Sequence, residues 1–178
     1  GPMQKPQLRP GDVVDIAGWF SGGSTNPAFV GTTPLRVVDT RNAIGGPKVR
    51  IQPGATLTVP MAGAAVRLTD GSAATIPTDA TAVAVNVTAV EPSQAGFFTV
   101  WPCGASMPVT SNLNFARGGA VANGVVAPLG AGGAICVSAA QGAAVLVDVP
   151  GWSGGGALPP FVAAVARRLV DTRNAIGG

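Results

Sequence analysis

The chain has 178 residues, of which 47% are hydrophobic and only 11% are charged, with 26 Gly, 16 Pro and neither His nor Tyr. The net charge of +3 comes from a few scattered groups, so the basic clusters with stacking aromatics that bind nucleic acids are missing and we expect no such partner. Gly, Pro, Asn or Thr interrupts each apolar run before it reaches the ~20 residues that cross a bilayer, so no membrane insertion is expected.

An internal repeat begins near the N-terminus. The string VVDIAGWFSGG at 13–23 recurs as LVDVPGWSGGG at 146–156, and VDTRNAIGG at 38–46 recurs at 170–178. The period of about 130 residues is longer than a solenoid unit, which has roughly 20 to 50. The repeat therefore predicts separate beads in tandem, each with its own core.

The repeat divides the chain into five parts. In chain order they are an expression scar with the tail strand of a preceding repeat at 1–20, a linker at 21–27, a complete β module at 28–152, a second linker at 153–160 and the head of the next repeat at 161–178. The linkers are rich in Gly, Ser and Pro, which makes them flexible at the glycines and stiffer at the prolines.

The module opens with a stretch that resists a regular assignment. PAFVGTTPLRVV at 27–38 aligns with PFVAAVARRLV at 160–170, which has the spacing of a helix. Gly31 and Pro34 would break such a helix in the first copy. Since equivalent positions should share one structure, we expect this stretch to be irregular.

Most later segments alternate apolar and other residues with the period of two that is typical of strands. Clear examples are Val83, Val85 and Val87; Phe98 and Val100; and Leu113 and Phe115. About eight or nine short strands separated by Gly- and Pro-rich turns, with no convincing helical stripe, predict an all-β fold. An antiparallel β-sandwich is the first interpretation and a closed β-barrel is the alternative.

Cys103 and Cys136 are the only cysteines, and without His they cannot complete a zinc site. They can form a disulfide or remain two separate buried thiols, and the exported-looking composition favours the disulfide. Trp101 follows an alternating strand beside Cys103, so we expect it to pack on the disulfide. A sugar-stacking platform is the alternative role for this ring.

Catalytic groups are scarce. The chain has no His for general-base work, a single Glu, Glu91, and no base placed to activate Cys103. Asp70 and Asp79 share one loop region, but their sequence is turn-like and lacks the acidic ladder of a calcium site. We therefore predict no enzyme activity, no cofactor and no obligatory metal.

The most prominent polar motif is Asp39-Thr40-Arg41, which occurs again in the second VDTRNAIGG string. On an extended segment Asp39 and Arg41 face the same side, while Thr40 can bond to nearby backbone. The favoured interpretation is a partly buried ion pair that anchors a turn. The alternative is an arginine presented to an acidic glycan or to a neighbouring module.

A second polar group consists of Asn86, Asn112, Asn114 and Asn123. Asparagine is disfavoured within strands, so each side chain needs a partner. We favour amides that satisfy backbone groups at turns and sheet edges. A polar groove for sugar hydroxyls is the alternative.

Seven strings, taken together and in order, resemble a family of extracellular bacterial repeat modules of actinobacterial type, found in surface proteins and attached to secreted hydrolases. They are RVVDTRNAIGG, VPMAG, AVAVNVTAVEP, GFFTVWPCG, SNLNFARGG, VANGVVAPLG and VLVDVPGW. The resemblance implies secretion, a β-rich fold, tandem arrangement and a non-catalytic role. Family modules often end in an aromatic pair, whereas here Trp152 precedes Ser153.

The sequence thus predicts a structural or adhesive repeat module of a secreted bacterial surface protein. Its expected partners are adjacent modules of the same or another chain, which the end fragments at 13–20 and 161–178 could join by strand addition. The plainer alternative is that each fragment pairs inside its own module. The alternative function is a carbohydrate- or cell-wall-binding module of a secreted hydrolase, with cell-wall glycan as its partner.

Overall fold

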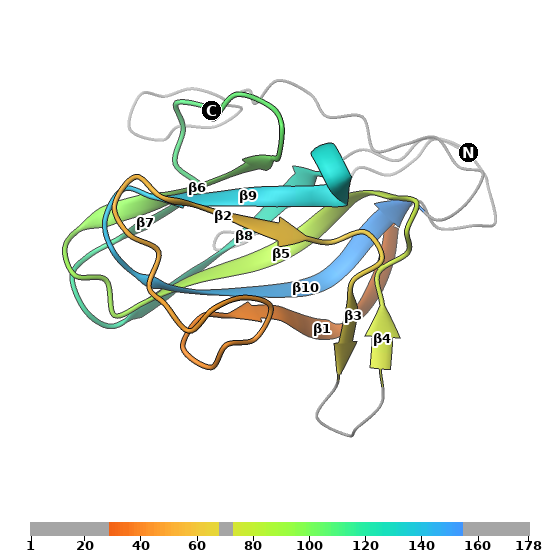
Figure 1. The fold of residues 1–178 in the computed structure, drawn as a ribbon, viewed down its shortest axis with the longest axis horizontal. Coiled ribbons are helices and arrows are strands. Elements are labelled where there is room, and N and C mark those ends of the chain that lie inside the picture. Colours follow the sequence, from red (N-terminus) through yellow and green to blue (C-terminus); the bar gives the residue numbers. More distant parts are fainter. Residues whose placement is uncertain (1–28, 68–72, 155–178) are drawn as a thin grey trace, which may run out of the picture.

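The computed structural model describes residues 29–67 and 73–154, which form two packed antiparallel sheets (Figure 1). One sheet has the strand order β1-β10-β5-β8, and the other has the order β2-β9-β6-β7. Within the described residues no strand pairing joins the two sheets. The predicted β-sandwich is therefore confirmed, and the closed barrel is wrong.

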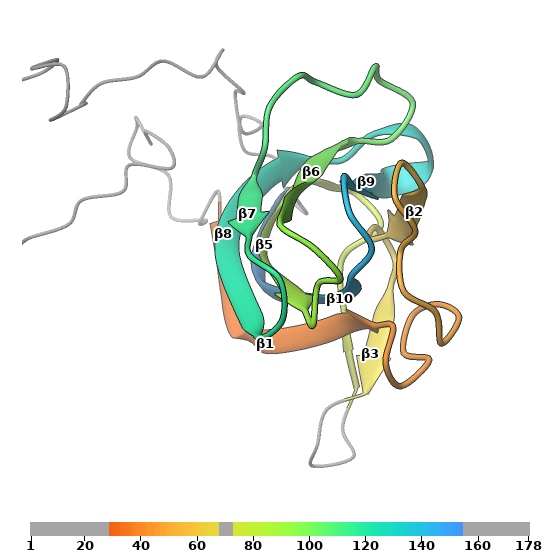
Figure 2. The same ribbon diagram turned by 90° about the vertical axis from the view of Figure 1, so that its left-hand side faces the viewer.

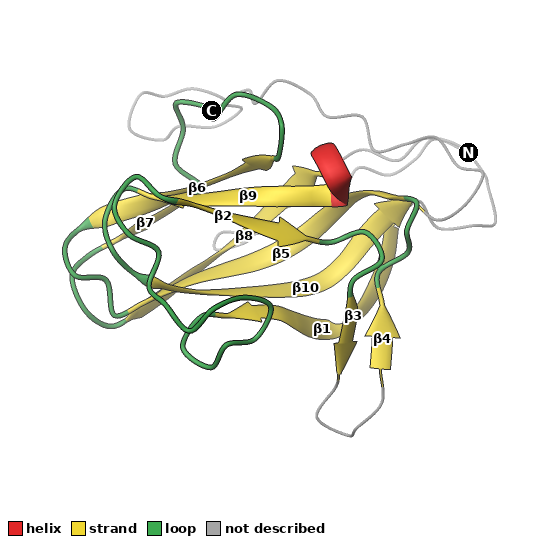
Figure 3. Ribbon diagram, viewed as in Figure 1, coloured by secondary structure: helices red, strands yellow, loops and turns green. Residues whose placement is uncertain are grey.

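The strands are long in the first sheet and short in the second (Figure 3). The first sheet contains β1 (Phe29–Asp39), β10 (Ala144–Gly154), β5 (Ala80–Val90) and β8 (Ala120–Pro128). The second contains β2 (Thr56–Pro60), β9 (Ala134–Ala139), β6 (Gly96–Pro102) and β7 (Leu113–Phe115). A small hairpin of β3 (Ala65–Arg67) and β4 (Ala73–Thr75) and a 3-10 turn, η1 (Ala131–Gly133), complete the described elements.

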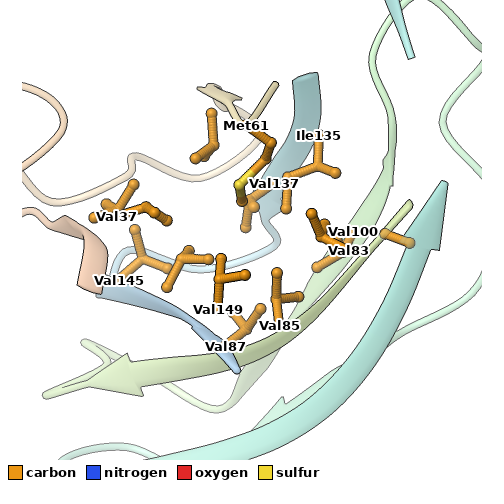
Figure 4. Packing of buried hydrophobic residues seen from close by; sticks show 14 of the residues in the cluster. Val37, Met61, Val83, Val85, Val87, Val100, Ile135, Val137, Val145 and Val149 are labelled. Atoms are coloured by element: carbon orange, nitrogen blue, oxygen red, sulfur yellow. The ribbon is translucent and has the colours of Figure 1, made fainter. Parts of the chain in front are cut away.

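The core lies between the two sheets and consists mainly of aliphatic side chains (Figure 4). Val83, Val85 and Val87 of β5 face inward, as their alternation predicts, and each buried side chain of this kind contributes about 1.5 to 3 kcal/mol. Phe98 and Phe115 meet edge to face with ring centroids 5.1 Å apart. The period of two therefore identified the inward faces correctly.

The expectation of an irregular stretch at the start of the module was wrong, because β1 is an eleven-residue strand. Its pairing with β10 is irregular: Pro34 lies within a register shift between Gly31 and Leu35, and a second shift follows between Arg36 and Val38. Proline lacks the N–H that a ladder needs and is tolerated at edges and bulges. The strand therefore tolerates Pro34 by lying at the sheet edge.

β10 is an interior strand, with β1 on one side and β5 on the other. Its Pro150 lies where the register with β5 shifts, between Asp148 and Gly151, so the missing N–H falls at an irregular point of the ladder. The strand continues through Ser153 and Gly154, past the expected module boundary at 152.

The two ends of the described module lie side by side. Phe29, the first residue of β1, pairs with Ser153 near the end of β10. A Cβ on Gly151 would lie 2.3 Å from the Phe29 ring, so glycine permits this close approach. Viewed along the strands, the sheets curve around the core, and β7 lies beside β8 (Figure 2).

Several predicted features fall outside the described residues. They are the expression scar and tail strand at 1–20, the first linker at 21–27, residues 155–160 of the second linker, the head of the next repeat at 161–178, and Asp70. Across 29–67 and 73–154 there is no helix long and apolar enough to cross a membrane.

Candidate functional site

The Asp39-Thr40-Arg41 motif forms a tight loop at the end of β1. The amide of Asp39 donates to the carbonyl of Ile44 at 3.0 Å, and the amide of Ile44 donates back at 3.1 Å. Gly45 then turns the chain with a φ of +66°, and a Cβ there would lie 1.9 Å from the carbonyl oxygen of Val37. The loop therefore folds back onto its own strand at a position that only glycine fits.

The carboxylate of Asp39 is the centre of this loop, with only 1% of the side chain exposed. It accepts hydrogen bonds from the amide of Arg41 at 3.0 Å, from Nε at 2.9 Å and from Nη2 at 2.8 Å. Nδ2 of Asn42 donates at 3.0 Å. The hydrogen bonds from Arg41 hold the pKa of Asp39 well below its ordinary value, despite burial, which acts in the opposite direction.

Thr40 joins the same loop to the neighbouring strand. Its Oγ1 accepts a hydrogen bond from the amide of Val145 at 3.0 Å, and its own amide donates to the carbonyl of Val145 at 3.1 Å. The Thr40 side chain therefore gives the amide of Val145 a hydrogen-bond acceptor that the backbone at the end of β1 does not supply. This contact fixes the loop against β10.

An ion pair that the sequence reasoning missed lies next to the loop. Nε and Nη2 of Arg36 donate to the two carboxylate oxygens of Asp148 at 2.8 and 3.1 Å, which links β1 to β10. Nη1 of Arg36 is also 3.8 Å from the carboxylate of Asp39. The repeat contained a signal, because Arg168 and Asp15 occupy the equivalent sequence positions.

The four asparagines do not gather into one groove. Asn112 Oδ1 accepts from the amide of Val100 at 2.7 Å, and Asn123 Nδ2 donates to the carbonyl of Asn112. These two amides thus satisfy backbone at the corner where β7 meets β8. Asn86 lies elsewhere, opposite Asp148 on the first sheet, and Asn114 lies exposed on β7 opposite Phe97.

Trp101 and the disulfide form a small cluster on the outer face of the second sheet. Cys103 is bonded to Cys136, and Trp101 packs with both cysteines and Ala134. The ring is 7% exposed, and its Nε1 donates to the carbonyl of Ala105 at 3.2 Å. A buried ring cannot stack on a sugar, so the structure places Trp101 in a packing role.

The polar groups that the structure brings together serve the framework. Asp39, Asp148 and Glu91 are each paired with an arginine. No group of three or more potential metal ligands occurs among the residues that the structure describes. Fold and site together define a disulfide-bonded antiparallel β-sandwich whose repeated polar motif fastens its first strand.

A scan against protein-family models, a search of curated proteins and a search of solved structures return no match.

Proposed function

We propose that the chain is a non-catalytic structural or adhesive repeat module of a secreted bacterial surface protein. The repeated strings supply the tandem arrangement, and the disulfide suits an oxidising location outside the cell. The observation that carries the proposal is the use of the DTR motif: Asp39 and Thr40 are buried in contacts that hold β1 to its loop and to β10.

The sheet edges support association with neighbouring modules by strand addition. β1 and β8 end the order of the first sheet, and a terminal strand leaves one row of main-chain groups to pair. From Ala120 to Val126, β8 is mostly exposed and carries no charged side chain. Such an edge lacks the charges that usually discourage pairing with another chain.

Deletion of residues 1–23 tests this association. If the tail at 13–20 adds to the sheet of a neighbouring module, the deletion should lower both the melting temperature and the self-association measured by sedimentation. A deletion that changes neither would contradict strand addition. Turnover of a cell-wall polymer by the intact chain would contradict the non-catalytic assignment.

A carbohydrate-binding module is the second candidate, and one observation favours it. Phe97 is 42% exposed and pairs across the strands with the exposed amide of Asn114. An exposed ring beside an amide can contact a sugar face and its hydroxyls. Pull-down on isolated cell walls, weakened by Phe97→Ala and unchanged by the matched control Val109→Ala, would favour this function over the structural one.

A further inference from the structure

β10 holds β1 along almost its whole length, with pairs from Phe29 and Ser153 to Asp39 and Leu146. The sequence contains a second version of this strand, FVAAVARRLVD, at 161–171. We propose that this edge of β10 is a strand-exchange site for two segments of the same chain, β1 and 161–171. We also infer that Leu35 is the residue that makes β1, and not 161–171, the strand that pairs with β10. The inference rests on the proposed tandem-module function.

The second version retains the residue types whose polar contacts fasten β1. Arg168 aligns with Arg36, so it carries the guanidinium that would face Asp148. The string after the strand is unchanged: VDTRNAIGG occupies 38–46 and 170–178. The second copy thus repeats the carboxylate, the threonine and the glycine on which the loop geometry depends.

The connection from β10 to the second version is short enough in sequence for it to pair with the same edge. If Phe161 takes the place of Phe29 opposite Ser153, residues 154–160 remain as the connection between two antiparallel neighbours. A connection of this length closes at little entropic cost. β1, by contrast, is separated from β10 in the sequence by all the intervening strands. The short connection therefore favours pairing of 161–171 with β10, so chain length does not explain why β1 is the strand that pairs there.

The two segments differ at six of their eleven positions, and at one of the six a charged residue aligns with a buried apolar one. Leu35 is completely buried in the core, and the aligned residue is Arg167. A guanidinium at that position would lose its water without gaining a charged partner, which is strongly unfavourable. Arg167 would therefore disfavour the second segment at this edge, and the module would retain its own first strand although both segments carry the same polar residues.

A pair of substitutions in the full chain tests this selection. Leu35→Arg should lower the midpoint of thermal unfolding by roughly 10 °C, because it puts the charge into the core. Adding Arg167→Leu should recover most of that loss, since 161–171 now carries the leucine. Adding Arg168→Leu is the matched control and should recover nothing, because the aligned Arg36 faces outward. Hydrogen exchange should show protection moving from 29–39 to 161–171 in the first double variant only.

Three results would overturn the proposal: a Leu35→Arg chain as stable as the wild type, a Leu35→Arg/Arg167→Leu chain that stays unfolded or unrescued, or a rescue in which 29–39 keeps its protection. Rescue accompanied by dimers would show that the strand comes from another chain, which also contradicts exchange within one chain. These results are independent of self-association by the wild-type chain, so failure of the exchange is distinguishable from failure of the proposed function.

Discussion

The buried carboxylate of Asp39 organises the loop that follows β1. It accepts hydrogen bonds from Arg41 and from Asn42, and its sequence neighbour Thr40 bonds to β10. Hydrogen bonds to an ionised group are stronger than those between neutral groups. Arg41 is itself exposed, so its charge remains hydrated while its donors fix the carboxylate.

Asp39→Asn should lower the free energy of unfolding by about 2 kcal/mol at pH 7, because the charge-assisted hydrogen bonds are lost. The folded-state pKa of Asp39 is depressed, so its contribution is present above the unfolded pKa of about 3.9 and is lost as the pH falls towards the folded pKa. Urea unfolding should therefore show the two proteins converging between pH 4 and about 2. The exposed Asp79→Asn is the control, and an equal deficit at both ends of the pH range would contradict this role.

Gly45→Ala should destabilise the fold far more than Gly54→Ala. Both glycines have positive φ, so both changes carry the strain of about 1 kcal/mol that this conformation imposes on alanine. Only at Gly45 would the new Cβ also collide with a backbone carbonyl, whereas nothing lies within 4 Å at Gly54. A thermal melt of the two variants measures the difference, and equal losses would show that the loop can move away.

At the scale of elements, strands with one buried face were predictable and β1 was not. The alternation of Val83, Val85 and Val87 marks their inward face whatever the strand order. In β1 the pattern is broken by two register shifts, so Val37 and Val38 are both buried although they are adjacent. No local period can reveal a bulge whose position is set by the partner strand.

The site was predictable where its contacts are local and unpredictable where they are not. Asp39 and Arg41 are two residues apart, and their pairing follows from the spacing. Arg36 and Asp148 meet only because the first and last strands of the module are neighbours, which the local spacing does not reveal. Asn112 and Asn123 likewise depend on the corner between β7 and β8.

The disulfide ties the segment after β6 to β9. Its cysteines are 33 residues apart, and closing such a loop restricts the unfolded chain by about 3 to 4 kcal/mol on the chain-entropy estimate. The Cys103→Ala/Cys136→Ala chain should lose about this amount in urea unfolding. A reducing agent should bring the wild type to the same value and leave the variant unchanged. A wild type insensitive to the reductant under unfolding conditions would contradict the assignment.

At the scale of the whole molecule, the chain enters and leaves the sandwich at the same end, because Phe29 lies opposite Ser153. A module with this geometry cannot extend an array by its full length. Successive modules in tandem would instead project sideways from the line of linkers.

Tension along such an array would act on β1 and β10, the first and last strands of the module. Force applied at Phe29 and Gly154 pulls neighbouring antiparallel strands apart from one end, so β1 would peel from β10 one hydrogen bond after another. Single-molecule pulling on these two residues should give a low rupture force. Pulling instead on Asp39 and Gly154, at opposite ends of the paired strands, loads the whole ladder at once and should require a clearly higher force. The module would then lengthen under load as β1 separates from β10, and the two strands would pair again when the load is removed.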